Sequence, residues 1–167
     1  VCDDNQGEIN REQQSVKPSK TISNEETSEH KDASDSSDSL LLNDRNALWR
    51  NNLRKLLKPK ERIGIERVKM PELDADYRAT KRLEEVNKGL TREMAIREAS
   101  RCLDCVNPSC VKGCPVNIQI PDFIKNIERG NIIDAAKVLK QTSALPAVCG
   151  RVCPQEKQCE SQCIHLK

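Results

Sequence analysis

Apolar residues recur with helical spacing along several stretches of this chain, and no stretch alternates strictly as a half-buried strand does. We therefore expect a mostly α fold. The first helical stretch covers residues 44–58, where Asn43 or Asp44 caps the start and Pro59 ends the helix. Its apolar positions are Leu48, Trp49, Leu53, Leu56 and Leu57.

Three further helices are predicted in the second half of the chain. Thr91 caps a helix that leads directly to Cys102. Pro121 suits the first residue of the next helix, which Gly130 closes, and Asn131 caps the third. The face that we expect the third helix to turn toward a small apolar core consists of Ile132, Ile133, Ala136 and Leu139. The last cysteines, 159–163, are expected to form one more helical turn.

The residues before position 91 are predicted to differ from this helical part. Residues 1–43 are rich in Ser, Asp, Glu and Lys, so they cannot bury enough apolar surface to offset their ordering entropy. We expect them to be a disordered acidic linker or tail. Residues 59–78 contain two prolines and are expected to be extended, and residues 79–88 to form a short helical turn that ends at Gly89.

These expectations divide the chain into three parts. The tail covers residues 1–43, a basic helix with an extended docking segment covers 44–90, and an α-helical domain covers 91–167. The chain starts at Val1 and stops two residues after His165, so we expect the last part to be truncated at its C-terminal end.

Composition limits how the chain can be stabilised. It has one Trp, one Tyr and one Phe in 167 residues, with a mean hydropathy of −0.71. A conventional core cannot use all of such a chain. Bound metal stabilises small domains, because the free energy of metal binding becomes free energy of folding.

The charge is unevenly distributed, with −6 on residues 1–43, +6 on residues 44–101 and +2 on residues 102–167. The basic middle lacks the aromatic side chains and motifs of a nucleic-acid surface, so nucleic acid is not an expected partner. A basic amphipathic helix also suits a calmodulin-like partner or a membrane surface. Docking against an acidic neighbouring domain is the favoured interpretation.

No run of residues approaches the roughly 20 apolar residues of a membrane span, and the chain shows no signal-peptide pattern. Membrane attachment is therefore not expected, and we expect a cytoplasmic protein.

Eight of the nine cysteines form two tight groups. The first group lies in CLDCVNPSCVKGCP and the second in CGRVCPQEKQCESQC. The cysteines of the first group are Cys102, Cys105, Cys110 and Cys114, and those of the second are Cys149, Cys153, Cys159 and Cys163.

Disulfides and zinc explain these groups less well than iron–sulfur clusters. Helical neighbours have Cβ atoms about 5–6 Å apart, whereas a disulfide needs about 3.8 Å. Zinc sites use C-x₂-C pairs but do not generally pack third and fourth cysteines so close and then add proline. A zinc-stabilised protein-interaction module remains the alternative from another functional class.

The spacing of the first group resembles a bacterial ferredoxin. The ferredoxin run is C-x₂-C-x₂-C-x₃-C-P, in which the fourth cysteine binds the other cluster, and this chain has C-x₂-C-x₄-C-x₃-C-P. Three neighbouring thiolates can reach three irons of one cubane, while Pro115 directs the chain away. The second group repeats the C-P pair at Cys153 and Pro154. We therefore predict two 4Fe–4S clusters, each bound by both groups.

The remaining residues offer no catalytic site. The chain has no phosphate-binding GxGxxG and no Ser/His/Asp arrangement, so single-electron transfer is the expected use of the clusters. His30 lies in the polar tail, and His165 is interpreted as a surface histidine rather than a group that tunes a cluster. Cys2 is interpreted as a lone exposed cysteine, with the last ligand of an upstream site as the alternative.

From about Arg62 to Lys167 the sequence resembles the N-terminal iron–sulfur domain of the glutamate synthase small subunit. The same domain occurs in dihydropyrimidine dehydrogenase and in the larger subunit of NADH-dependent ferredoxin:NADP oxidoreductase, also called sulfide dehydrogenase. The resemblance lies in CLDCVNPSCVKGCPVNIQIPDFIKNIERG and ALPAVCGRVCPQEKQCESQC. It implies an α-helical ferredoxin-like domain with two 4Fe–4S clusters.

The resemblance also implies which cysteines bind each cluster. Cluster one is implied to have the ligands Cys102, Cys105, Cys110 and Cys163. Cluster two is implied to have Cys114, Cys153 and Cys159, with a non-cysteine fourth ligand from a helix beyond the end of the chain. The position of Cys149 is implied not to be a ligand, although spacing alone would make it one. Cluster two then lacks a ligand here unless Cys149 or solvent substitutes.

The family function implied is an electron relay. In full-length relatives a FAD domain and an NAD(P)H domain follow, and electrons pass through the clusters to a partner's flavin. The expected partner is a glutamate synthase large subunit, with the same module in a ferredoxin:NADP oxidoreductase or sulfide dehydrogenase as the alternative. This chain itself contains no FAD or NAD(P)H site.

Overall fold

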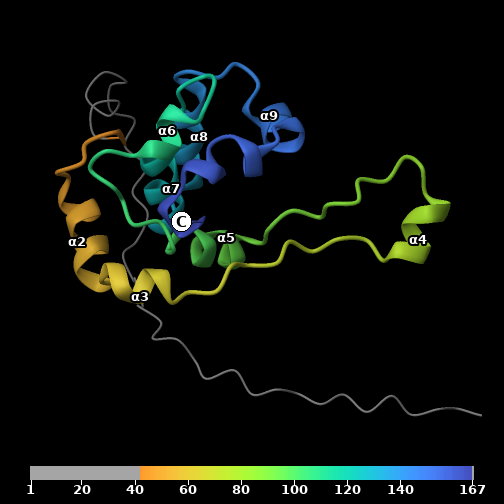
Figure 1. Cartoon of the computed structure of the whole chain (residues 1–167), viewed down its shortest axis with the longest axis horizontal. Helices are drawn as coiled ribbons and strands as arrows, with labels where there is room; N and C mark the ends of the chain where they lie inside the picture. Colours follow the sequence, from red (N-terminus) through yellow and green to blue (C-terminus); the bar gives the residue numbers. More distant parts are fainter. Residues whose placement is uncertain (1–41, 167) are drawn as a thin grey trace, which may run out of the picture. The chain divides into compact units, whose positions relative to one another are not determined.

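The computed structural model describes residues 42–166, and their regular secondary structure is helical, with one isolated antiparallel bridge between Glu72 and Asn87. The predicted mostly α fold is confirmed for this part of the chain. The predicted tail, except its last two residues, lies outside the described residues, as do Cys2 and His30. The helices are α2 (Leu48–Leu56), α3 (Pro59–Ile63), α4 (Ala75–Thr80), α5 (Arg92–Ala99), α6 (Ser109–Lys112), α7 (Ile120–Glu128), α8 (Ile132–Lys140) and α9 (Pro146–Val152) (Figure 1).

Helix α2 begins later than predicted. Its N-cap is Ala47, which has no side-chain capping bond, and the Asp44 carboxylate instead accepts the Asn46 N–H at 2.8 Å. Pro59 does follow the end of α2, as expected, but it also begins α3. Lys58 is extended because the residue before a proline avoids the helical region. Proline suits the first helical position, where no N–H is required.

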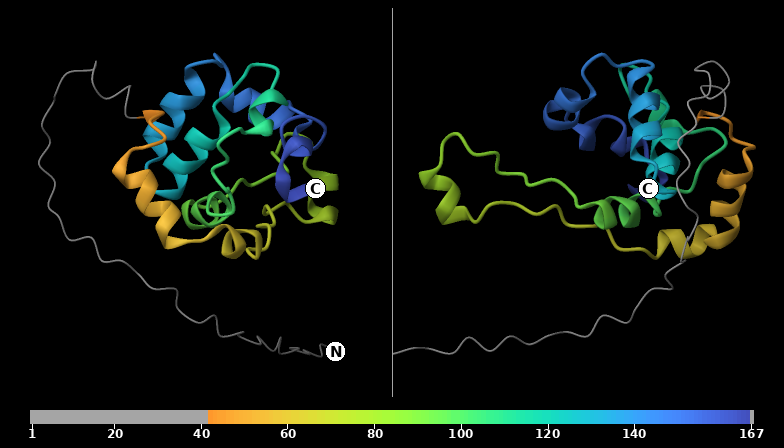
Figure 2. Two further views of the ribbon diagram at one scale, coloured as in Figure 1. Left: turned by 60° about the vertical axis from the view of Figure 1, so that its left-hand side comes forward. Right: turned by 180° about the vertical axis from the view of Figure 1, so that it is seen from behind.

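Residues between α3 and α5 form an arm that runs out to α4 and back (Figures 1 and 2). Its two sides are joined where the Leu73 N–H donates to the Val86 carbonyl at 2.9 Å and the Lys88 N–H donates to the Pro71 carbonyl at 2.8 Å. The expectation that residues 59–78 are extended is wrong at both ends, which form α3 and most of α4. Asp74 starts α4 because its carboxylate accepts two backbone N–H groups of the first turn.

The capping residues predicted for the cysteine-bearing part are confirmed. The Thr91 hydroxyl accepts the Met94 N–H at the start of α5, and the Asn131 side chain accepts the Asp134 N–H at the start of α8. Gly130 follows α7 with φ of +84°, a conformation that glycine adopts without strain. These caps place α7 and α8 as a packed pair with α5 against α7.

The apolar core is small, and α8 does not turn the predicted face toward it. Ile132 and Ile133 are 41% and 69% exposed, whereas Ala135 and Val138 are buried. Helix α8 has apolar residues on more than one face, and only one face can be buried. The packing against α7 determines which face that is. Helix α7 in turn buries mainly polar groups. The buried residues of α7 are Pro121, Lys125, Asn126 and Glu128.

In the part of the chain that the structure describes, every helix is too short or too polar to cross a membrane.

Candidate metal centre

Four cysteines from both groups lie together: Cys102 and Cys105 follow α5, Cys110 lies in α6, and hydrogen bonds of the neighbouring Gln162 and His165 hold Cys163 near them. Burial raises the pKa of Cys110 to about 11, and the charges of Cys102 and Cys163 add to the rise. Burial is also the main reason that the pKa of Cys102 is raised, and the charge of Cys105 raises this pKa further. Thiolate charges act on one another in this way only at short range. The fold therefore brings these four thiols into one neighbourhood, which we call set one: Cys102, Cys105, Cys110 and Cys163.

The other four cysteines form a second neighbourhood, set two: Cys114, Cys149, Cys153 and Cys159. Partial burial raises the pKa of Cys153, and the nearby Cys149 and Cys114 raise it further. Burial also raises the pKa of Cys159, and Cys114 contributes again. Cys114 comes from the first sequence group, so both sets draw on both groups.

The chemistry of the two sets suits iron–sulfur clusters. All eight cysteines are free thiols, and cysteine thiolate is the ligand that holds a 4Fe–4S cluster. Such a cluster takes four protein ligands, and each set brings four thiols into one neighbourhood.

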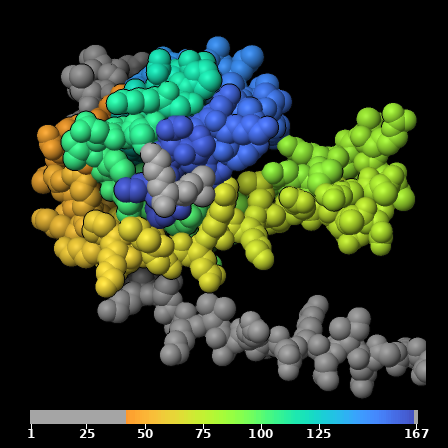
Figure 3. Space-filling model, viewed as in Figure 1, coloured from red at the N-terminus to blue at the C-terminus, as the bar shows by residue number. Residues whose placement is uncertain are grey.

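Gly113 lies where the two cysteine groups cross. A Cβ atom at this position would lie 2.8 Å from the Gln158 carbonyl and 3.1 Å from the Cys159 Cα. The Ser109 hydroxyl donates to the Gln162 carbonyl at 2.6 Å in the same contact. The space-filling view shows these two parts of the chain, turquoise and blue, packed side by side (Figure 3). The crossing therefore positions Cys110 and Cys114 against the last cysteines.

Replacement of Gly113 by alanine should force this crossing apart, because two of the three atoms that the Cβ atom would meet belong to the backbone, which cannot move aside as a flexible side chain can. We expect a loss of about 1–3 kcal/mol of stability and less iron bound per chain. Gly150→Ala is the matched control, since nothing lies within 4 Å of its Cβ position and alanine favours helix α9. Urea denaturation and iron analysis measure both effects, and equal behaviour of the two variants would contradict the role of Gly113.

Asp104, between two cysteines of set one, is buried among three arginines. Its carboxylate accepts from Arg50 at 2.6 and 3.0 Å, from Arg54 at 2.7 Å and from Arg45 at 3.2 Å. Burial alone would raise the pKa of Asp104, but hydrogen bonds and charge from Arg50 and Arg54 outweigh it and hold this pKa below its usual value. Arg50 also pairs with Asp122 of α7 at 2.7 Å. These ion pairs attach α2 to the cysteine loop and to α7.

A second buried group of charges contacts the backbone around Cys102. Arg62 pairs with Glu128 at 2.8 Å and donates to the Ser100 carbonyl at 2.6 Å. Lys125 has no exposed surface, and its Nζ donates to the Cys102 carbonyl at 2.7 Å and to the Glu128 carboxylate. Helix α3 and helix α7 thus both contact the backbone at Cys102.

Sequence analysis missed these buried charges. It interpreted residues 44–90 as docking against a neighbouring domain, whereas residues 45–62 contact the cysteine-bearing part of the same chain. One available signal was the spacing of the arginines, since Arg50 and Arg54 lie one helical turn apart and face the same side of α2. The other was an aspartate between two cysteines with few apolar neighbours.

His165 is half-buried, which differs from the surface position predicted for it. Its Nε2 lies 2.7 Å from the Arg101 carbonyl, so this nitrogen carries the proton that is donated. The bond holds the residues after Cys163 beside the start of the first cysteine group. His165 therefore helps to keep the two ends of set one together.

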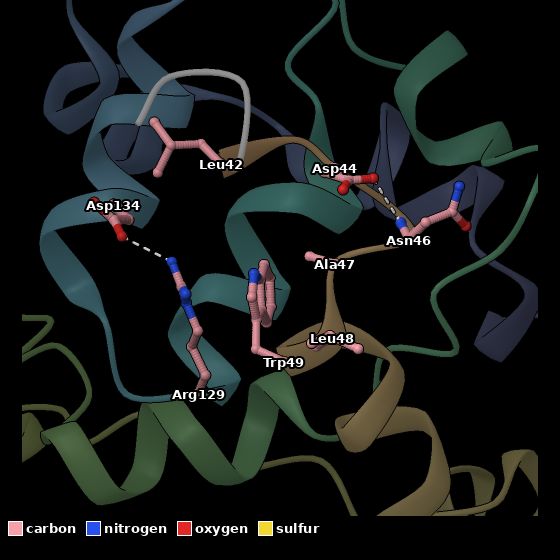
Figure 4. Close-up of a pocket in the computed structure, with 8 residues that line it drawn as sticks. All are labelled: Leu42, Asp44, Asn46, Ala47, Leu48, Trp49, Arg129 and Asp134. Atoms are coloured by element: carbon pink, nitrogen blue, oxygen red, sulfur yellow. Dashed lines mark hydrogen bonds and ion pairs between the residues drawn. The ribbon is translucent and has the colours of Figure 1, made fainter. Parts of the chain in front are cut away.

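A hollow of about 600 Å³ has no cysteine in its lining (Figure 4). Arg129 stacks over the Trp49 ring at 4.1 Å and pairs with Asp134 at 2.7 Å. Through these two contacts Arg129 links Trp49 of α2 to Asp134 of α8. The hollow is lined by Leu42, Asp44, Asn46, Ala47, Leu48, Trp49, Arg129 and Asp134.

Comparison with known proteins identifies a family for the cysteine-bearing part of the chain. Residues 78–167 match the family described as dihydropyrimidine dehydrogenase domain II, 4Fe-4S cluster. The glutamate synthase [NADPH] small chain of Halomonas elongata is 40% identical over 93 residues, which are 56% of this chain and 20% of that protein. The corresponding protein of Escherichia coli K12 is 40% identical over 101 residues, or 60% and 21%.

A third relative has another named activity. The NAD-dependent dihydropyrimidine dehydrogenase subunit PreT of Escherichia coli K12 is 43% identical over 81 residues, which are 48% of this chain and 20% of that protein. The chain therefore spans about a fifth of the length of each of these relatives.

Proposed function

This chain belongs to the family described as dihydropyrimidine dehydrogenase domain II, 4Fe-4S cluster, and from that premise we propose that it is the electron-transfer module of an NAD(P)H-dependent oxidoreductase. The observation that carries the proposal is the gathering of eight free cysteines into two sets of four, each drawn from both sequence groups. A bound 4Fe–4S cluster supplies reversible one-electron chemistry. The helices of this chain hold the thiols in place for it.

The proposed ligands of cluster one are the four cysteines of set one: Cys102, Cys105, Cys110 and Cys163. The proposed protein ligands of cluster two are Cys114, Cys153 and Cys159, with a fourth ligand from outside these residues. Cys149 also belongs to set two, but its thiol lies 3.8 Å from the Ser143 hydroxyl and has that group as a partner. We propose that Cys149 is not a ligand, so Cys149→Ala should retain the full iron content.

Two of the relatives, both named glutamate synthase [NADPH] small chain, favour a glutamate synthase small subunit as the parent protein. In this proposal a downstream domain binds FAD and NAD(P)H, and a glutamate synthase large subunit or similar flavoprotein receives the electrons at its flavin. The dihydropyrimidine dehydrogenase subunit among the relatives supports the same module with another acceptor. A ferredoxin:NADP oxidoreductase or sulfide dehydrogenase is the corresponding alternative. Free thiols suit a reducing compartment, so the cytoplasm is the proposed location.

Anaerobic reconstitution with iron and sulfide tests the proposal. We expect broad visible absorbance that dithionite bleaches, and iron and inorganic sulfide in equal amounts, because each cubane holds as many sulfides as irons. The control is the same chain reconstituted with zinc alone. A colourless protein that binds zinc and takes up no sulfide would instead support a zinc-stabilised interaction module.

A further inference from the structure

Five cationic side chains are gathered around the loop that joins Cys102 to Cys105. Four of the five come from residues 45–62, which lie outside the part of the chain that matches the family. The fifth comes from α7. These residues are Arg45, Arg50, Arg54, Arg62 and Lys125.

Several of these cations donate directly to the backbone of the loop. Arg45 donates to the Asp104 carbonyl at 2.6 Å and to the Cys105 carbonyl at 2.8 Å. Lys125 donates to the Cys102 carbonyl at 2.7 Å. The positive groups are therefore held against the same peptide units that carry the thiols of set one.

The carboxylates in this region do not balance the cations. Asp104, Asp122 and Glu128 are the acids paired with the five cations, so two positive charges remain. The side chains of Arg50 and Lys125 are only 1% and 0% exposed, so water does little to screen them. Excess buried charge is costly unless an opposite charge lies nearby. A 4Fe–4S cluster with four thiolates is anionic, and its negative charge grows on reduction.

We infer that residues 45–62, together with Lys125, raise the reduction potential of the cluster bound by set one. The inference rests on the proposed function. Buried cations stabilise the reduced cluster more than the oxidised cluster, because the reduced cluster is more negative. Lys112, Arg151 and Lys157 lie within two residues of set two cysteines in the sequence, and all three are exposed, so solvent screens their charge. An electron shared between the two clusters therefore favours the cluster of set one.

Three single substitutions test the sign of this effect in the reconstituted chain, with each cluster followed by electron paramagnetic resonance during a redox titration. Lys125→Gln and Arg54→Gln each remove a positive charge and should lower the midpoint potential of the set one cluster. Glu128→Gln removes a negative charge and should raise it. For Lys125→Gln we expect about a tenfold change in the reduced-to-oxidised ratio at fixed potential, which is 59 mV for one electron.

The predicted shifts in midpoint potential have opposite signs, which distinguishes an effect of charge from an effect of a loosened cluster site. A loosened site would shift the midpoint potential of all three variants in one direction. Arg54 is 29% exposed, so Arg54→Gln remains informative if Lys125→Gln does not assemble its cluster. Arg78→Gln is the matched control, because Arg78 is 43% exposed, lies in the arm and pairs with exposed Glu72, so its loss should leave both potentials unchanged.

Midpoint potentials that do not move in the three variants, or that all move the same way, would overturn this inference alone. Failure of the unsubstituted chain to assemble any cluster would instead overturn the proposed function.

Discussion

Replacement of Cys102 by alanine is expected to abolish one of two clusters and to destabilise the helical fold. Cys102 follows α5 directly, and its carbonyl accepts hydrogen bonds from Lys125 and Arg62, so the residue joins the cluster site to the buried charges. Without the thiolate, the set one cluster loses a ligand and the fold loses the associated binding energy. Iron and sulfide per chain should fall by about half, since one of two proposed cubanes remains.

Cys149→Ala is the matched control, because it removes a thiol from the same sequence pattern. We expect this variant to retain the full iron content if Cys149 is not a ligand, with only its contact to Ser143 lost. Anaerobic iron and sulfide analysis and thermal denaturation measure both variants. Equal iron loss in Cys102→Ala and Cys149→Ala would refute the assignment and make Cys149 the fourth ligand of set two.

Replacement of Asp104 by alanine should be among the most destabilising changes outside the cysteines. The Asp104 side chain is 1% exposed and neutralises Arg50, which is equally buried. Removing one partner of a buried ion pair leaves an uncompensated charge and costs about 3–5 kcal/mol. Asp104 also has a φ of +54°, a conformation that aspartate tolerates better than alanine. The midpoint of anaerobic urea denaturation should therefore fall sharply.

Two variants control for this result. Asp104→Asn keeps a hydrogen-bond acceptor and the tolerance for positive φ but loses the charge, so we expect an intermediate loss of stability. Glu72→Gln removes the carboxylate of an exposed pair with Arg78, which should change stability by about 0.5 kcal/mol at most. If Asp104→Ala denatures at the same urea concentration as Glu72→Gln, the buried ion pairs do not hold α2 to the cysteine loop.

Local signals in the sequence were sufficient for the cysteine groups and for some of the helix ends. Caps at Thr91 and Asn131, and the closing Gly130, depend on hydrogen bonds and backbone preferences within a few residues, so the sequence alone predicts them. The two tight cysteine groups likewise reflect ligands supplied by neighbouring residues. The scarcity of large apolar side chains correctly indicated a small core.

Only the tertiary structure decided which side chains are buried. Arg50 and Asp104 are 54 residues apart, and nothing local to either residue distinguishes a buried ion pair from two solvated charges. The same holds for α8, where Val138 is buried and Ile133 is exposed because α7 packs on one side of a helix that is apolar on several. Helix caps and turns depend on residues close together in the sequence. Burial depends instead on every helix and loop that packs against a side chain. This chain therefore specified its cysteine groups and some of its helix ends locally, and the positive surroundings of set one only through the folded arrangement.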